Sequence, residues 1–89
     1  NLVPKNMLHW TGSKVALIEL LYGLYTTGNF NNGNTDIKTI AAYFEKVFDI
    51  ELGDYYRAYL ELRMRQNPTK FIDTMKDTLL RKMEEDDEK

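Results

Sequence analysis

The sequence predicts a small all-α protein, a compact four-helix domain that contains a helix-turn-helix and has no β-hairpin wing. Apolar residues recur at helical spacing in four segments, and clusters of turn-forming residues separate these segments. The chain has 89 residues, 43% of them hydrophobic, which is enough for one small core. We place the domain at residues 11–83, between a boundary segment at 1–10 and an acidic tail at 84–89.

The first predicted helix is the most apolar part of the chain. Residues 15–25 leave almost no polar face, which is typical of a central helix that the other helices surround. Thr11 or Ser13 can cap its start, and Gly28 can end it. Its single charged residue, Glu19, is expected at an exposed edge.

The second predicted helix has the clearest amphipathic period. Between residues 37 and 48, apolar positions fall at i, i+3, i+4, i+7, i+10 and i+11, which predicts one face buried on the first helix. We expect Thr35 to cap this helix. A short joint at residues 49–53 then leads to the third helix, and its length fits the crossed helix pair of a helix-turn-helix.

The third predicted helix carries charges on one side and tyrosines on the other. On a wheel of 100° per residue, four charged side chains form one stripe: Asp54, Arg57, Glu61 and Arg65. We call these four residues the charged stripe. The opposite face holds Tyr55, Tyr56 and Tyr59. At helical spacing, such tyrosines are more typical of a core with hydroxyls at its rim than of a surface that stacks on bases.

The charged stripe has two interpretations that its charge pattern does not separate. In the first, the stripe lies in a major groove, where arginine forms a bidentate contact with guanine and the acids position the arginines or accept from cytosine. In the second, Arg57 and Glu61, four residues apart, form a surface ion pair worth roughly 0.5 kcal/mol or less.

A fourth helix is predicted after Gln66. Asn67 is a suitable cap, and Pro68 suits the first helical position. Five apolar residues supply its expected buried face: Phe71, Ile72, Met75, Leu79 and Met83.

Charge is unevenly distributed along the chain. The formal net charge is −2, but residues 57–82 carry seven bases and three acids, a net of +4. Residues 84–89 carry five acids and one base, which is typical of a solvated, frayed end. Threonine and basic side chains near helix ends suit contacts to DNA phosphates. The candidates for such contacts are Thr35, Lys38, Arg63 and Lys70.

The residue inventory argues against several other classes of protein. The absence of cysteine excludes disulfides and thiolate metal sites, and it permits a reducing cytoplasmic location. One histidine and one serine, His9 and Ser13, form no catalytic set, so we predict no enzyme, no cofactor and no metal. The longest apolar-rich run is too short to span a bilayer. Because the chain begins at Asn1 rather than methionine, we expect a preceding domain in a longer protein.

Five short motifs, in order along the chain, carry a family resemblance. They are Trp10-Thr11-Gly12-Ser13-Lys14, Leu20-Leu21-Tyr22, Asn31-Asn32-Gly33-Asn34, Gly53-Asp54-Tyr55-Tyr56-Arg57 and Thr69-Lys70-Phe71. Together they resemble the C-terminal part of RteC-family proteins, from about His9 to Glu85. The resemblance implies an all-helical, two-domain regulator from a conjugative transposon of gut anaerobes, with a helix-turn-helix in its C-terminal domain.

From the residues and this resemblance, we predict a DNA-binding domain of a transcriptional regulator that controls mobile-element excision genes. The expected partners are double-stranded DNA and an N-terminal domain of the same full-length protein, with a homodimer left open and no membrane. The alternative is a helical protein-interaction or oligomerisation module without DNA binding, because the Met-containing fourth helix and acidic tail suit a docking surface. Steep salt dependence would distinguish DNA binding from an apolar helix contact.

Overall fold

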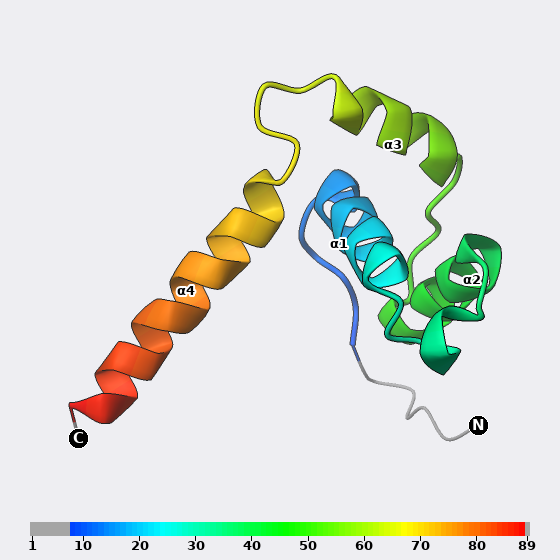
Figure 1. Ribbon diagram of the computed structural model, residues 1–89. Coiled ribbons are helices and arrows are strands. Elements are labelled where there is room, and N and C mark those ends of the chain that lie inside the picture. The colour runs from blue at the N-terminus through cyan, green and yellow to red at the C-terminus, as the bar shows by residue number, and fades with distance from the viewer. Residues whose placement is uncertain (1–7, 89) are drawn as a thin grey trace.

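The computed structural model describes residues 8–88, which fold into four α-helices and one short 3-10 helix (Figure 1). In chain order these are α1 (Lys14–Thr27), η1 (Asn31–Gly33), α2 (Ile37–Phe48), α3 (Tyr55–Arg63) and α4 (Lys70–Asp87). Residues 8–88 contain no strand, and the predicted all-α class is confirmed.

The central helix is α1, as its apolar composition predicts. Each of α2, α3 and α4 packs on α1, which lies between α3 and α2 in Figure 1. Leu17, Ile18 and Leu21 of α1 are fully buried. Residues from α2 and the following joint pack with them in the main buried cluster: Ile40, Ala41, Phe44 and Leu52. Leu62 of α3 is also buried. Because α2 and α3 meet chiefly through α1, the helix-turn-helix pairing stays a prediction.

Side-chain caps fix the starts of the first two helices. The Ser13 hydroxyl accepts a hydrogen bond from the Ala16 amide at 3.1 Å, and Gly28 ends α1 in a left-handed conformation, with φ of 70°. The expected cap of α2 at Thr35 is wrong, because Asp36 accepts from the Thr39 amide at 2.8 Å. The Thr35 hydroxyl instead pairs with the side chain of Asn31.

The segment before α1 is attached to the bundle. The Trp10 amide donates to the Phe48 carbonyl at 3.0 Å, and the Trp10 ring lies edge-on to Phe48 and Phe71. The His9 Nδ1 atom lies 2.7 Å from a carboxylate oxygen of Asp49. The remainder of the predicted boundary segment, residues 1–7, lies outside the described residues, as does the last residue of the predicted acidic tail.

The expectation that Glu19 is exposed is wrong. Glu19 is buried, and its two carboxylate oxygens accept hydrogen bonds from the amides of Phe71 at 3.2 Å and Ile72 at 2.7 Å. These amides lie in the first turn of α4, where free N–H groups and the helix dipole favour a negative charge. Glu19 of α1 therefore caps α4 from a distance of some fifty residues in sequence and fixes α4 on α1.

The predicted start of α4 is also wrong. The helix begins at Lys70 rather than at Pro68, and Gln66–Thr69 form the turn that leads into it. Thr69 occupies the cap position but makes no side-chain capping hydrogen bond. The carboxylate of Glu19 takes the capping role that the sequence pattern assigns to Asn67.

Only the first turns of α4 pack on the bundle, and the rest of the helix extends away from it (Figure 1). Phe71 and Ile72 are half-buried, whereas Leu79 is 53% exposed and Met83 is 50% exposed. The predicted buried face is therefore covered only at its N-terminal end. The helix continues through Asp87, so four of the acidic residues that we expected to be frayed are helical.

Candidate nucleic-acid interface

The charged stripe begins with a residue that stabilises the start of α3. The Asp54 side chain accepts a hydrogen bond from the Arg57 amide at 3.1 Å, and Tyr55 is the first helical residue. An N-cap carboxylate satisfies an amide that has no partner inside the helix and interacts favourably with the helix dipole. Asp54 thus has a structural role before any role toward DNA is considered.

The middle of the charged stripe is paired with itself. Arg57 Nε lies 3.7 Å from a carboxylate oxygen of Glu61, one turn later on α3. Both side chains are more than two-thirds exposed, at 77% and 71%. Such an exposed ion pair contributes little to stability and opens at little cost. The surface ion pair that the sequence left open is therefore formed, and it leaves both side chains accessible to a ligand.

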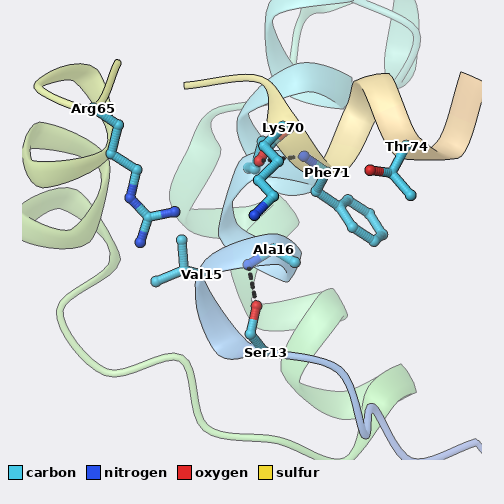
Figure 2. A pocket seen from close by; sticks show the side chains of 8 residues that line it. Ser13, Val15, Ala16, Arg65, Lys70, Phe71 and Thr74 are labelled. Atoms are coloured by element: carbon cyan, nitrogen blue, oxygen red, sulfur yellow. Dashed lines mark hydrogen bonds between the residues drawn. The ribbon is translucent and has the colours of Figure 1, made fainter. Parts of the chain in front are cut away.

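The last member of the charged stripe lies outside the helix. α3 ends at Arg63, and Arg65 follows in the turn toward α4, where its amide donates to the Leu62 carbonyl at 3.1 Å. The helical wheel places Arg65 in line with Arg57. The turn instead directs its side chain toward the starts of α1 and α4 (Figure 2).

Arg65 and Lys70 lie together at one open pocket of about 250 Å³. Figure 2 shows both side chains pointing toward the start of α1, where Ser13 and Ala16 form the floor. Both cations are exposed, and neither forms an ion pair within residues 8–88. We call Arg65 and Lys70 the basic corner.

The electrostatic surroundings of the basic corner favour an anion. The start of α1 contributes the positive end of a helix dipole to the pocket. Glu19 also lines the pocket, but its two oxygens are directed to the amides of Phe71 and Ile72. Two cations and a helix start are the kind of groups that hold a phosphate oxygen.

The other phosphate candidates are dispersed over the molecule. Thr35 is half-buried beside α2 and lines a second pocket, of about 380 Å³, together with the aromatic residues Phe30 and Tyr43. Lys38 is exposed in the first turn of α2. Arg63 lies with its guanidinium carbon 6.0 Å from the centre of the Tyr59 ring, at the C-terminal end of α3. The structure thus brings Lys70 together with Arg65, which the sequence assigns to a different set.

The tyrosines of α3 are divided between core and surface. Tyr59 stacks on Tyr22 of α1, with ring centroids 3.9 Å apart and planes at 9°. Burial and the neighbouring tyrosines raise the pKa of the Tyr22 hydroxyl. Tyr55 is half-buried as predicted, but Tyr56 is 59% exposed, so the prediction that it belongs to the core is wrong.

Sequence reasoning missed the contribution of α1 to this region. The sequence predicts Ser13 as a cap, but no local pattern places the start of α1 beside Arg65 and Lys70. One signal was present: Glu19 is an isolated acid in an otherwise apolar helix. A buried acid needs hydrogen-bond donors, and its donors are the amides that begin α4.

These features define a small all-helical domain with an exposed basic surface where α1, α3 and α4 meet. A family model described as RteC protein matches residues 1–87. The chain therefore belongs to the RteC family, and the resemblance carried by the five motifs is confirmed. No curated protein and no solved structure was found to match it. None of the described helices is both long and apolar enough to cross a membrane.

Proposed function

We propose that this chain is the DNA-binding domain of a transcriptional regulator that controls the excision genes of a mobile element. Membership of the RteC family supports this proposal, because the family resemblance implies regulators of conjugative transposons. In this proposal, α3 enters the major groove and α2 crosses above it. The domain works in the cytoplasm as part of a longer protein that has a preceding domain.

The observation that carries the proposal is the basic corner. Arg65 and Lys70 are exposed, lie at the same pocket and have no acidic partner within residues 8–88. Unpaired cations beside a helix start bind phosphate oxygens without first breaking an ion pair. Contacts of this kind position a domain on the duplex but do not select a sequence.

Sequence selection is assigned to the helical part of the charged stripe. Arg57 and Glu61 are exposed on α3 and are held together only by a weak surface pair. When the pair opens, the arginine fork is free for a guanine edge and the carboxylate for a cytosine amino group. The basic corner and the stripe thus take the two different tasks that a DNA-binding domain requires.

A titration at several salt concentrations tests this assignment. The DNA is a labelled duplex from upstream of the excision genes of the element that encodes the protein, compared with a scrambled duplex. We expect salt-sensitive binding to both duplexes and tighter binding to the upstream duplex. Replacing Arg65 and Lys70 together by alanine should weaken binding to both duplexes and reduce the salt slope by about 2, or about 1 for each phosphate that the protein no longer neutralises.

The matched control is Arg81→Ala, which removes one exposed cation from α4 well beyond the pocket. It should leave both affinities nearly unchanged. If the parent protein does not bind either duplex, or if the double variant at Arg65 and Lys70 binds as the parent does, the proposal is wrong. Absence of DNA binding would favour the alternative, a helical interaction module.

A further inference from the structure

The distal part of α4 exposes several large apolar side chains on one side of the helix. Four residues form this distal face: Met75, Leu79, Leu80 and Met83. Their exposed fractions are 38%, 53%, 49% and 50%, although they recur at the spacing of a buried helix face. A helical segment of roughly a dozen residues is only marginally stable in water without a packing partner. The distal face therefore has the properties of a surface that another element covers.

The distal face continues the face by which α4 packs on α1. At the near end, Ile72 lies close to α1, since a Cβ atom added at Gly23 would be 3.2 Å from the Ile72 Cδ1 atom. Phe71 packs edge-on against Trp10, with ring centroids 5.8 Å apart. Beyond these contacts the helix leaves the bundle (Figure 1). A partner of α4 therefore has room only along the distal part of the helix, because α1 already covers the N-terminal part.

Two charged residues, which share the side of the helix that carries the distal face, indicate what that partner is. Lys76 lies at the near end and Asp87 at the far end, eleven residues later. At 100° per residue, eleven residues bring the helix round to almost the same side, and they span about 16 Å. In an antiparallel pair of α4 helices related by a two-fold axis, Asp87 of the second copy can lie opposite Lys76 of the first. The two-fold symmetry then forms the same ion pair a second time at the other end of the contact. In the same register, Leu80 of one copy lies opposite Met83 of the other.

A parallel pairing fits much less well. It would place two clusters of five acids, residues 84–88, side by side, where their charges repel. It would also bring the second copy's bundle to the end of α4 that α1 already covers. The antiparallel arrangement keeps the two bundles at opposite ends, and it is the isologous contact expected of a two-fold dimer.

We propose that the distal face of α4 binds the same face of a second copy of this chain in an antiparallel pair. The Leu80 and Met83 side chains form the centre of the contact, and Lys76 pairs with the partner's Asp87 at each end. Because the basic corner lies at the opposite end of α4, the two basic corners are held apart in one dimer. This inference does not depend on the proposed binding of DNA.

Sedimentation equilibrium of the whole chain over a wide range of concentrations tests the pairing. We expect a reversible monomer–dimer equilibrium, and Leu80→Glu should weaken it at least tenfold because it places a charge opposite Met83 at the centre of the apolar contact. Tyr43→Glu is the matched control, since Tyr43 is 65% exposed on α2 and lies outside the distal face. Circular dichroism establishes that both variants remain helical. A parent protein that stays monomeric, or a dimer that Leu80→Glu leaves intact, overturns the proposal.

A charge exchange tests the direction of the pairing. Lys76→Glu alone and Asp87→Lys alone should each weaken the dimer several-fold, because each places like charges opposite one another. The double variant that carries both changes restores opposite charges and should restore most of the affinity. In a parallel pair, residue 76 faces residue 76 and residue 87 faces residue 87, so like charges face one another in the parent and in every variant, and the double variant would bind no better than either single variant. Failure of this recovery overturns the antiparallel arrangement even where a dimer exists.

Discussion

The two ends of α3 use their charges in different ways. At the N-terminal end, Asp54 caps the helix and Arg57 pairs with Glu61, so these charges are satisfied within α3 itself. At the C-terminal end, Arg65 leaves the helix and lies beside Lys70 at the start of α4, with no acidic partner in the described part of the chain. A single stripe on the helical wheel is thus two different surfaces in the molecule.

The difference shows what a charge pattern leaves undetermined. Spacing along a helix specifies which side chains share a face, but not where the helix ends or which neighbouring helix lies beside it. Arg65 follows the end of α3 by two residues, and its neighbours come from α1 and α4. Functional assignments for the two ends of α3 therefore need separate tests.

The largest expected effect comes from Glu19, which holds the α4 side of the basic corner in place. Glu19→Ala leaves the amides of Phe71 and Ile72 without their acceptor and opens a gap beneath the start of α4. We expect the free energy of unfolding to fall by about 2–4 kcal/mol. Urea denaturation followed by circular dichroism measures this change. Because Lys70 begins α4, the same variant should also lower DNA affinity by displacing one cation of the basic corner.

Two further variants separate this role from a general effect of removing an acid. Glu61→Ala removes a 71% exposed acid from α3 and should change the free energy of unfolding by less than about 0.5 kcal/mol. Glu19→Gln keeps one carbonyl oxygen as an acceptor and should recover part of the loss. Equal stabilities for Glu19→Ala and Glu61→Ala would contradict the capping role of Glu19.

The next effect compares the two ends of α3 directly in DNA binding. If Arg57 makes the proposed bidentate contact to a base, Arg57→Ala should weaken binding to the preferred duplex by roughly 1–3 kcal/mol and relax sequence preference. Arg65→Ala should instead weaken binding to preferred and scrambled duplexes alike. The ratio of the two affinities, measured for each variant at one salt concentration, distinguishes these outcomes. If both variants stay folded and bind the preferred duplex as tightly as the parent, both assignments are wrong.

Much of the helical layout follows from local sequence signals. The period of residues 37–48 and the apolar character of 15–25 located α2 and α1, and Ser13 and Gly28 marked the ends of α1. These features depend on residues within a few positions of one another, so they can be identified without knowledge of the fold.

The missed features depend on contacts between distant parts of the chain. The capping of α4 by Glu19 joins residues more than fifty positions apart. The distal face of α4 has the same period as the half-buried first turn of the helix, so periodicity alone predicts that the whole face is covered. Arg65 and Lys70 line the same pocket because of the path of the turn at 64–69, which no local pattern specifies.

Removal of the α3 cap tests whether the N-terminal end of the stripe is structural. Asp54→Ala should lower the free energy of unfolding by about 1 kcal/mol, because the Arg57 amide loses its acceptor at the start of α3. Asp54→Asn keeps a capping oxygen and should recover most of this loss. Thermal and urea denaturation of the two variants provide the measurement. A stability for Asp54→Ala that equals that of the parent would mean that the hydrogen bond contributes nothing and that Asp54 is free for DNA.

The smallest expected effect concerns the ion pair between Arg57 and Glu61. Its atoms are 3.7 Å apart and both side chains are well exposed, so water screens the attraction and the pair should contribute less than about 0.5 kcal/mol to stability. A double-mutant cycle of Arg57→Ala and Glu61→Ala in urea denaturation measures this coupling. A near-zero coupling together with a large drop in DNA affinity for Arg57→Ala would mean that the arginine is retained for its contact with DNA. A coupling above about 1 kcal/mol, beyond the range of exposed pairs, would instead assign the N-terminal end of α3 to the fold. The N-terminal end of α3 would then serve to stabilise the fold, and only the C-terminal end would remain assigned to DNA binding.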